Sequence, residues 1–386
     1  MKEVILMKRI LTGLQPSGEL TIGSLIGGIS QTIKYQDEYE KKVLEILRKG
    51  WYVLGPEVKA FEEEFASFCG AKYCVGLASG LDALILAVRA LKIKDGDEVI
   101  LPSNTYIATV MGATINGAKP VFVEPDEFYN IDASKIEEKI TDKTKAIIIT
   151  HLYGQACNMK KICEIVKKHN LHLIEDCAQA HGATFNGQMV GTFGDVGCYS
   201  FYPSKNLCAF GDAGAIITNN PDIEEYIRIL RNYGSEKRYY NKYVGLNSRL
   251  DEIQAALLRI KLTHLNELNE ERYRIASKYN NEIKNKFIEI PKLRDGATSV
   301  NHLYVIRTKY RDKLMKYLND NDVGTIIHYP IPPHLSEAYK YLGYKNGDYP
   351  ISETLANEVL TLPLYNGMTE EEQDYVIKKI NEFEVN

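Results

Sequence analysis

Apolar, β-rich runs alternate with helical patterns through the middle of the chain, and this alternation limits the fold more than any other feature. The runs that read as buried strands, each ending in polar or small residues, are 97–106, 119–126, 145–154, 171–180 and 196–204. Helical periodicity marks 80–93, 159–170 and 222–234. Such alternation predicts an α/β fold with a mostly parallel sheet and helices on both faces. Ligands of these sheets bind at the carboxyl ends of the strands.

The pattern changes near residue 250, where a long, charged helical stretch begins. Short strands are expected after it at 302–309 and 324–332, and helices at 312–320 and 369–383. We therefore predict a large domain over residues 41–265 and a smaller α+β C-terminal domain over residues 266–386.

Composition narrows the class of protein. The net charge of -4 argues against a protein built to hold nucleic acid or anionic lipid. No apolar run approaches the roughly 20 residues that span a bilayer, and Lys8 and Arg9 interrupt the apolar start of the chain, which makes it a poor secretory signal. The seven cysteines show no CxxC spacing. They predict reduced thiols in the cytoplasm, with no metal site.

One lysine, Lys205, stands among aromatic, small and turn-forming residues in "SFYPSKNLCAFGDAGA" (200–215). Two other expected strand ends bear on it: Asp176 in "IEDCAQAHG", and Ser79 with Gly80, which open a helix. Each has an ordinary explanation, because aspartate caps helices, helices begin at serine and lysine is usually solvated. A helix start is also a place where free N–H groups bind phosphate.

Together these residues match the requirements of pyridoxal 5'-phosphate. This cofactor needs a lysine amine for its aldehyde, a carboxylate beside its pyridine nitrogen and a phosphate nest. The order of helix start, strand-end aspartate and lysine is that of the aspartate-aminotransferase-type fold, PLP fold type I. No GxSxG, P-loop or HExxH motif competes, and "GTFGDVG" has the wrong glycine spacing for a dinucleotide site.

Four segments resemble the sugar aminotransferases of the DegT/DnrJ/EryC1/StrS family. They are "EDCAQAHGA", "GDVGCYSFYPSKNLCAFGDAGAIITNN", "LRNYGSEKRYYNKYVGLNSRLDEIQAALLRIKL" and "HYPIPPHL", in family order within residues 40–386. The resemblance departs from the family at Leu81, where many members have a hydroxyl residue and a contact must come from backbone N–H. It also departs at Cys208, where glycine is common.

The resemblance implies a role for each matching residue. Lys205 holds the cofactor and moves the proton, Asp176 pairs with the pyridine nitrogen, and Gln179 lies against the ring near its phenolic oxygen. The implied stacking residue is Tyr106. The implied phosphate contacts are Ser79, Gly80, Leu81, Ser200 and, from the partner subunit, Asn247. The active sites are therefore expected to be shared within a homodimer.

The implied reaction moves an amino group from L-glutamate to a keto nucleotide sugar. The motifs are most similar to members that aminate the third carbon of a dTDP-3-keto-6-deoxyhexose; amination at the fourth carbon of the dTDP-4-keto isomer is the alternative. A lysine rather than a histidine at 205 favours transamination over the dehydration that some relatives perform. Expected residues of the sugar site are His328, His334 and Tyr153, each of which is equally compatible with structural packing. Arg249 is expected near the dimer contact.

Residues 7–39 resemble a second family, the opening of a bacterial tryptophanyl-tRNA synthetase, with "QPSGELTIG" as its signature loop. No KMSKS-like loop follows, so a tRNA ligase is disfavoured. We expect residues 1–40 to be a leader without function. A catalytically idle sensor on the same fold is disfavoured by the complete set of Asp176, Gln179, Ser200 and Lys205.

Overall fold

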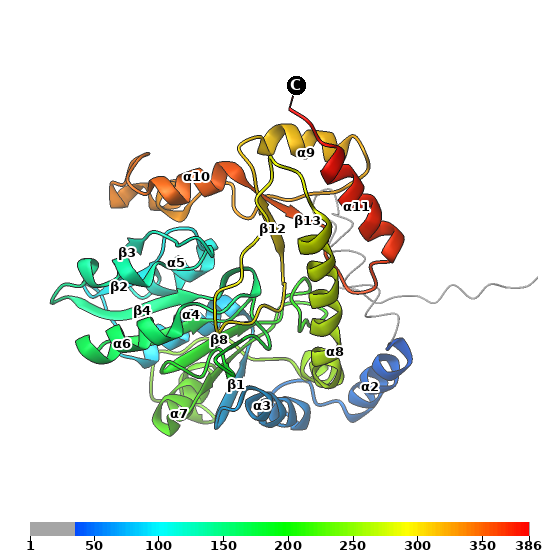
Figure 1. The fold of residues 1–386 in the computed structure, drawn as a ribbon. Coiled ribbons are helices and arrows are strands. Elements are labelled where there is room, and N and C mark those ends of the chain that lie inside the picture. The colour runs from blue at the N-terminus through cyan, green and yellow to red at the C-terminus, as the bar shows by residue number, and fades with distance from the viewer. Residues whose placement is uncertain (1–34, 386) are drawn as a thin grey trace, which may run out of the picture.

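A seven-stranded sheet forms the centre of the larger part of the protein (Figure 1), in a computed structural model that describes residues 35–385. Its strands are β1 (Tyr73–Leu77), β2 (Glu98–Pro102), β3 (Lys119–Val123), β4 (Thr144–Thr150), β5 (His172–Asp176), β8 (Val196–Ser200) and β9 (Gly214–Thr218), in the spatial order β1-β9-β8-β5-β4-β2-β3. The strands from β8 to β3 are parallel, and β9 is antiparallel to both β8 and β1. The predicted mostly parallel sheet is confirmed.

Two apolar cores lie on the two faces of this sheet, because successive residues of a strand point to opposite sides. In β4, Ile147 and Ile149 belong to one core, whereas Ala146 and Ile148 belong to the other. The first core is covered by α3 (Pro56–Cys69) and α6 (Met159–His169), and the second by α4 (Gly80–Ala90), α5 (Ile107–Thr114) and α7 (Pro221–Leu230). Strands that are buried on both faces explain the unbroken apolar runs of the sequence.

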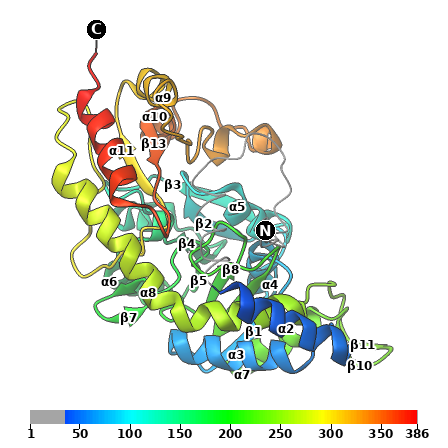
Figure 2. The same cartoon turned by 90° about the vertical axis from the view of Figure 1, so that its right-hand side faces the viewer.

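The long helix α8 (Glu252–Glu282) connects the two ends of the protein. It packs beside α2 (Gln36–Lys49) and α3 at its start and beside α11 (Glu370–Glu382) near its end (Figures 1 and 2). The helix runs without a break through residue 265, where we place the domain boundary, and this division stays a prediction. The C-terminal part also contains the antiparallel strands β12 (Tyr304–Arg307) and β13 (Val359–Leu362), with α9 (Arg311–Asn319) and α10 (Pro350–Glu358).

The prediction of a strand over 324–332 is wrong. Only Ile326 forms a bridge, with Thr361, and the segment continues as an irregular loop. Its prolines, which lack an N–H to donate, explain why a ladder cannot extend; they are Pro330, Pro332 and Pro333. The strand expected over 302–309 is present as β12.

The first turn of α3 is capped by a residue distant in the sequence. Glu252, at the start of α8, accepts hydrogen bonds from the backbone N–H groups of Gly55, Glu57 and Val58 at 2.8 to 3.0 Å. A carboxylate at this place also interacts favourably with the helix dipole. A Cβ atom at Gly55 would lie 2.6 Å from the Glu252 carboxylate, so any larger residue there would displace the group that caps the helix.

Residues 1–34 lie outside the described residues, and with them most of the leader predicted from the synthetase resemblance over 7–39. Two short hairpins, β6–β7 (Thr184–Phe185 and Gln188–Met189) and β10–β11 (Ser235–Lys237 and Tyr240–Asn241), complete the strands between 35 and 385. No helix in this range is long and apolar enough to cross a membrane.

Candidate active site

A pocket of about 550 Å³ lies at the carboxyl ends of the parallel strands, where the C-terminal part closes over the sheet. From the sheet side it is lined by Ser79, Gly80, Leu81, Leu84, Tyr106, Thr150, Asp176, Gln179, Ser200 and Lys205. From the C-terminal side it is lined by Arg272, His302, Gly324, Ile326, His328, Tyr329 and Thr361. The structure thus brings eight predicted cofactor residues of this chain, together with His328, to one cavity.

Lys205 lies in the turn that follows β8, and its backbone N–H donates to the Tyr202 carbonyl at 2.8 Å. Surrounding protein removes water from its amine and lowers the pKa of Lys205 to about 8, while the Asp176 carboxylate acts in the opposite direction. A lysine in this state is deprotonated far more often near neutral pH than a solvated one. The amine is therefore suited to act as a nucleophile and a base.

Asp176 ends β5 and is 5% exposed. Its Oδ2 atom accepts a hydrogen bond from Thr109 Oγ1 at 2.8 Å, and its Oδ1 atom accepts one from the Ala178 N–H at 3.1 Å. Burial raises the pKa of Asp176, and the hydrogen bond from Thr109 opposes this rise. Such a fixed carboxylate in a water-poor pocket suits a cationic ring nitrogen.

Ser79 and Gly80 form the start of α4, where backbone N–H groups lack partners within the helix. Ser79 Oγ accepts a hydrogen bond from the Asp82 N–H at 3.1 Å, so this serine caps the helix as well as lining the pocket. A Cβ atom at Gly80 would lie 2.5 Å from Ser200 Cβ. The absence of a side chain at Gly80 lets β8 approach the helix start and forms a cradle for an anion.

Two tyrosines and an amide line the side of the cavity near Asp176. The rings of Tyr106 and Tyr329 lie 5.2 Å apart between centroids and are tilted by 37°. Gln179 Nε2 donates to Tyr329 Oη at 3.0 Å, and Gln179 Oε1 accepts from the Tyr153 N–H at 2.7 Å. Tyr106 is 53% exposed, which leaves ring surface free for a flat ligand.

Four predicted residues do not line this pocket. Tyr153 lies behind it and donates its hydroxyl to the His328 carbonyl. His334 is buried elsewhere, with its Nε2 atom 3.0 Å from Glu353 Oε1. Asn247 is exposed, and Arg249 Nη1 donates to Asn232 Oδ1 at 3.0 Å. The roles predicted for these four residues stay predictions.

His328 faces the pocket, and its Nδ1 atom lies 2.7 Å from Thr361 Oγ1. Burial, together with the nearby Lys205, lowers the pKa of His328 to about 4. The imidazole is therefore neutral near pH 7, so it can offer a hydrogen bond to a polar ligand without adding positive charge.

Sequence reasoning missed a hydrogen-bonded group behind Lys205. Asn206 Nδ2 donates to Asn269 Oδ1 and to the Val300 carbonyl, both at 2.9 Å, and its Oδ1 atom lies 3.1 Å from His302 Nδ1. His302 lines the pocket, so the residue after Lys205 is fixed by the opposite wall. The one sequence signal was the position of Asn206 beside the lysine.

Arg272 was also missed. It projects from α8, is 6% exposed, and lines the pocket. Its Nε atom donates to Asn366 Oδ1 at 2.9 Å, and its Nη1 atom donates to the carbonyls of Asn301, His302 and Leu364 at 3.3 to 3.4 Å. Burial lowers the pKa of Arg272 to about 10. The side chain is still cationic near pH 7 and makes this wall positive.

His151, Glu175 and Cys177 place three potential metal ligands within 4.8 Å of one another behind Asp176. Glu175 already accepts hydrogen bonds from three backbone N–H groups, and its Oε2 atom lies 3.0 Å from His151 Nε2. His151 Nδ1 in turn accepts from the Cys157 N–H at 3.1 Å. These bonds account for the cluster as support for β5, and the expectation of no metal site stays a prediction.

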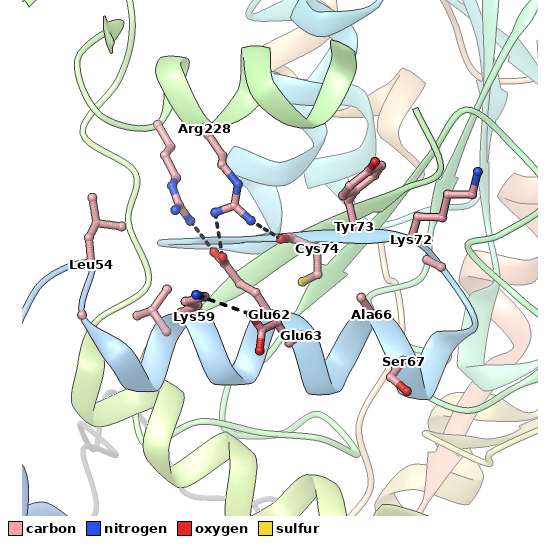
Figure 3. Close-up of a pocket in the computed structure, with 14 residues that line it drawn as sticks. Leu54, Lys59, Glu62, Glu63, Ala66, Ser67, Lys72, Tyr73, Cys74 and Arg228 are labelled. Atoms are coloured by element: carbon pink, nitrogen blue, oxygen red, sulfur yellow. Dashed lines mark hydrogen bonds and ion pairs between the residues drawn. The ribbon is translucent and has the colours of Figure 1, made fainter. Parts of the chain in front are cut away.

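A larger hollow of about 720 Å³ lies away from these residues, between α3, β1 and α7 (Figure 3). Glu62 crosses it and forms ion pairs with Arg228 at 2.7 Å and with Arg231 at 2.6 Å. Its Oε1 atom also accepts the Gly76 N–H at 2.8 Å. This carboxylate is fully engaged, and burial raises the pKa of the Cys74 thiol that lines the hollow, so that thiol is protonated near neutral pH. We therefore assign the chemistry to the pocket around Lys205.

Comparison with known proteins identifies the family of the chain. The model of the DegT/DnrJ/EryC1/StrS aminotransferase family matches residues 34–381. A dTDP-3-amino-3,6-dideoxy-alpha-D-galactopyranose transaminase from Aneurinibacillus thermoaerophilus is 52% identical over 91% of this chain and 96% of its own length. The structure of DesV from S. venezuelae with a ketimine intermediate superposes with a TM-score of 0.90 at 41% identity, covering 92% of this chain and 96% of that one. The structure of NtdA from Bacillus subtilis with bound cofactor PMP has a TM-score of 0.84 at 29% identity, covering 98% and 89%.

Proposed function

The chain belongs to the DegT/DnrJ/EryC1/StrS aminotransferase family, and on that premise we propose that it moves an amino group from L-glutamate to a keto nucleotide sugar with pyridoxal phosphate as cofactor. The observation that carries the proposal is the shared pocket of the Lys205 amine and the buried Asp176 carboxylate at the strand ends. An amine with a lowered pKa and a fixed carboxylate are the two groups that this cofactor requires.

The residues present fit the cofactor. Lys205 would bind its aldehyde, Asp176 its ring nitrogen, and the N–H groups from Gly80 onward, with Ser200, its phosphate. Tyr106 would stack on the ring, and Gln179 would lie near the phenolic oxygen. When bound, pyridoxal phosphate supplies an aldehyde that captures amines and a ring that withdraws electrons from the carbon attached to the captured nitrogen.

Lys205 also acts as the proton carrier once its amine is free. Its Nζ atom would take a proton from the substrate carbon that bears the nitrogen. It would then deliver a proton to the cofactor carbon on the other side of that nitrogen, so one group serves as base and then as acid. With a pKa of about 8, both the neutral amine, which acts as a base, and the protonated amine, which acts as an acid, are populated near neutral pH. Arg272 and the neutral His328 orient the substrate from the opposite wall.

We propose that the amine is added to the third carbon of a dTDP-3-keto-6-deoxyhexose. The support is the 52% identity to a transaminase whose product carries its amine at that carbon. The pocket selects the carbon by the rotation in which it holds the hexose, so the fourth carbon of the dTDP-4-keto isomer is the competing outcome.

Incubation of the enzyme with L-glutamate and each keto sugar separately, followed by NMR of the product, tests this proposal. A new C–N bond at the third carbon is expected. An amine found only at the fourth carbon would overturn the position but not the reaction. No amine on either sugar, with cofactor bound, would overturn both.

We further propose a homodimer in which Asn247 completes the partner's phosphate site. The support is that Asn247 is exposed and does not line the pocket of its own chain. It follows the hairpin β10–β11, which packs against α7 and projects from the molecule in Figure 2. Arg249 lies two residues further along, and Tyr233 packs near it with 5.5 Å between the guanidinium and the ring.

Subunit mixing tests this arrangement. A Lys205→Ala chain mixed with an Asn247→Ala chain gives heterodimers in which one site has both native residues and the other has neither. Activity should return on mixing. No return despite proven subunit exchange would mean that Asn247 acts within its own chain.

Two further parts of the proposal concern the cellular compartment of the enzyme and the N-terminal leader. We propose a cytoplasmic enzyme, supported by seven free cysteines within residues 35–385, which is typical of reducing compartments. We also propose that the synthetase-like leader has no role in transamination, supported by a family match that begins at residue 34. Deletion of residues 1–34 should leave turnover largely unchanged, and activation of tryptophan by the full chain would contradict the proposal.

A further inference from the structure

A buried lysine contacts a buried cysteine just beyond the catalytic turn. Lys261 Nζ, on α8, donates to Cys208 Sγ at 3.0 Å, and the two residues are 1% and 2% exposed. Within residues 35–385 no carboxylate forms an ion pair with Lys261. Its other neighbours are aromatic, with Nζ 4.8 Å from the Phe210 ring centroid and 6.0 Å from that of Tyr39.

This pair is chemically unlike the other buried thiols of the chain. Burial raises the pKa of Cys69 to about 12 and that of Cys163 to about 11, as expected for thiols among apolar groups. Cys208 instead has an amine as its direct neighbour, with Lys261 Nζ 3.0 Å from its sulfur. A buried amine without a carboxylate is costly unless sulfur serves as its partner.

We propose that Cys208 and Lys261 are a modification site at which dioxygen links the two side chains through one oxygen atom, as Sγ–O–Nζ. One thiol, one neutral amine and one dioxygen give one bridge and one water. The O–O bond, the S–H bond and one N–H bond break, and the S–O and O–N bonds form. The two released hydrogens leave in the water with the second oxygen atom. The sulfur and the amine nitrogen are oxidised, and dioxygen is reduced.

Position favours this chemistry over ordinary thiol oxidation. Dioxygen is small and apolar and can reach a buried site, and Cys208 lies three residues after Lys205, which lines the open pocket. The amine touches the sulfur, so an oxygen atom added at Sγ is next to a nucleophile rather than water. The bridge would join residues 53 positions apart and fasten the segment after Lys205 to α8. It should therefore stabilise the fold as other crosslinks do.

Intact-mass measurement of the full chain with its cofactor tests the proposal. Protein exposed to air should show a species heavier by one oxygen atom and lighter by two hydrogen atoms than protein kept without oxygen. Proteolysis should yield one peptide pair that contains both Cys208 and Lys261. A thiol reductant should remove the shift, and the bridged form should melt at a higher temperature than the reduced form.

Variants identify the atoms. Cys208→Ala and Lys261→Met should both lose the shift, whereas Cys163→Ala, which removes a partly exposed thiol elsewhere, should keep it. A gain of oxygen without loss of hydrogen would indicate a sulfenic acid and overturn the bridge. Absence of any shift in the air-exposed native chain would also overturn it, and this outcome does not depend on whether the variants fold. None of these measurements requires the enzyme to be active.

Discussion

The sheet side of the pocket takes its side chains from the ends of parallel strands, whereas the opposite side takes them from α8 and from loops of the C-terminal part. The first side provides the amine, the carboxylate and the phosphate cradle. The second provides Arg272, the neutral His328 and the hydrogen bonds that fix Asn206. In the proposed reaction the sheet side would carry the chemistry, and the C-terminal part would position the substrate; the hydrogen bonds to Asn206 already join that part to the turn of Lys205.

Replacement of the catalytic amine should have the largest effect. Lys205→Ala should lower turnover by at least on the order of 10⁴-fold, because the nucleophile and the proton carrier are lost together. It should also abolish the visible absorbance of covalently held cofactor. Steady-state kinetics and absorbance spectra measure both. Lys72→Ala, which removes an exposed lysine, is the matched control. Full turnover in Lys205→Ala would show that Lys205 is neither the nucleophile nor the proton carrier.

Asp176→Asn should come next, with a loss on the order of 10²–10³-fold in kcat. The amide keeps the shape of the carboxylate but cannot stabilise a cationic ring nitrogen. Thr109→Val is the companion variant, because it removes only the hydrogen bond to Asp176 Oδ2 and should cost less. Equal losses in the two variants would show that orientation, rather than charge, is what Asp176 contributes.

Loss of the hydrogen bonds between the catalytic turn and the C-terminal side should affect stability as much as rate. Asn206→Ala removes two donated hydrogen bonds and should cost about 1–3 kcal/mol of unfolding free energy, measured by urea denaturation. Because the neighbouring Lys205 is then less well held, kcat should fall by roughly tenfold. Asn357→Ala, which changes an exposed residue of α10, is the control. If Asn206→Ala lost as much rate as Lys205→Ala, the view that the C-terminal side only positions the catalytic turn would be wrong.

The smallest effect is a shift in a pH profile. In cofactor-free protein, the rate at which Lys205 captures pyridoxal phosphate should rise with pH and level off above about pH 8, where the amine is neutral. Asp176 raises the pKa of Lys205, so Asp176→Asn should move the midpoint to lower pH. Stopped-flow absorbance measures the rate, and an unchanged midpoint would contradict the coupling.

The same lowered pKa affects stability with a definite sign. Between about pH 8 and the ordinary lysine value of 10.5, the unfolded chain binds more protons at Lys205 than the folded chain. The contribution of this group to the unfolding free energy therefore rises with pH across that window. Comparison of native protein with Lys205→Met by urea denaturation across the window isolates the effect.

The sheet side was predictable because strand ends are neighbours by topology. Asp176 and Lys205 each follow an apolar run, and parallel strands bring such positions to one edge. The other side was not. Arg272 stands in a helix rich in charge, and nothing local marks it as one of the few charged residues that are buried there. His328 and His334 stand six residues apart in one proline-rich segment, and only the path of that loop decides which of them faces the pocket.

The cap that Glu252 places on α3 has a consequence for how the chain is made. The three N–H groups at the start of α3 have their acceptor nearly two hundred residues downstream. A ribosome releases residues 55–58 long before residue 252, so the growing chain holds this turn open to water. The cap on α3 must wait for α8, which makes it a non-local step of folding. The first turn of α3 is therefore completed well after it is synthesised.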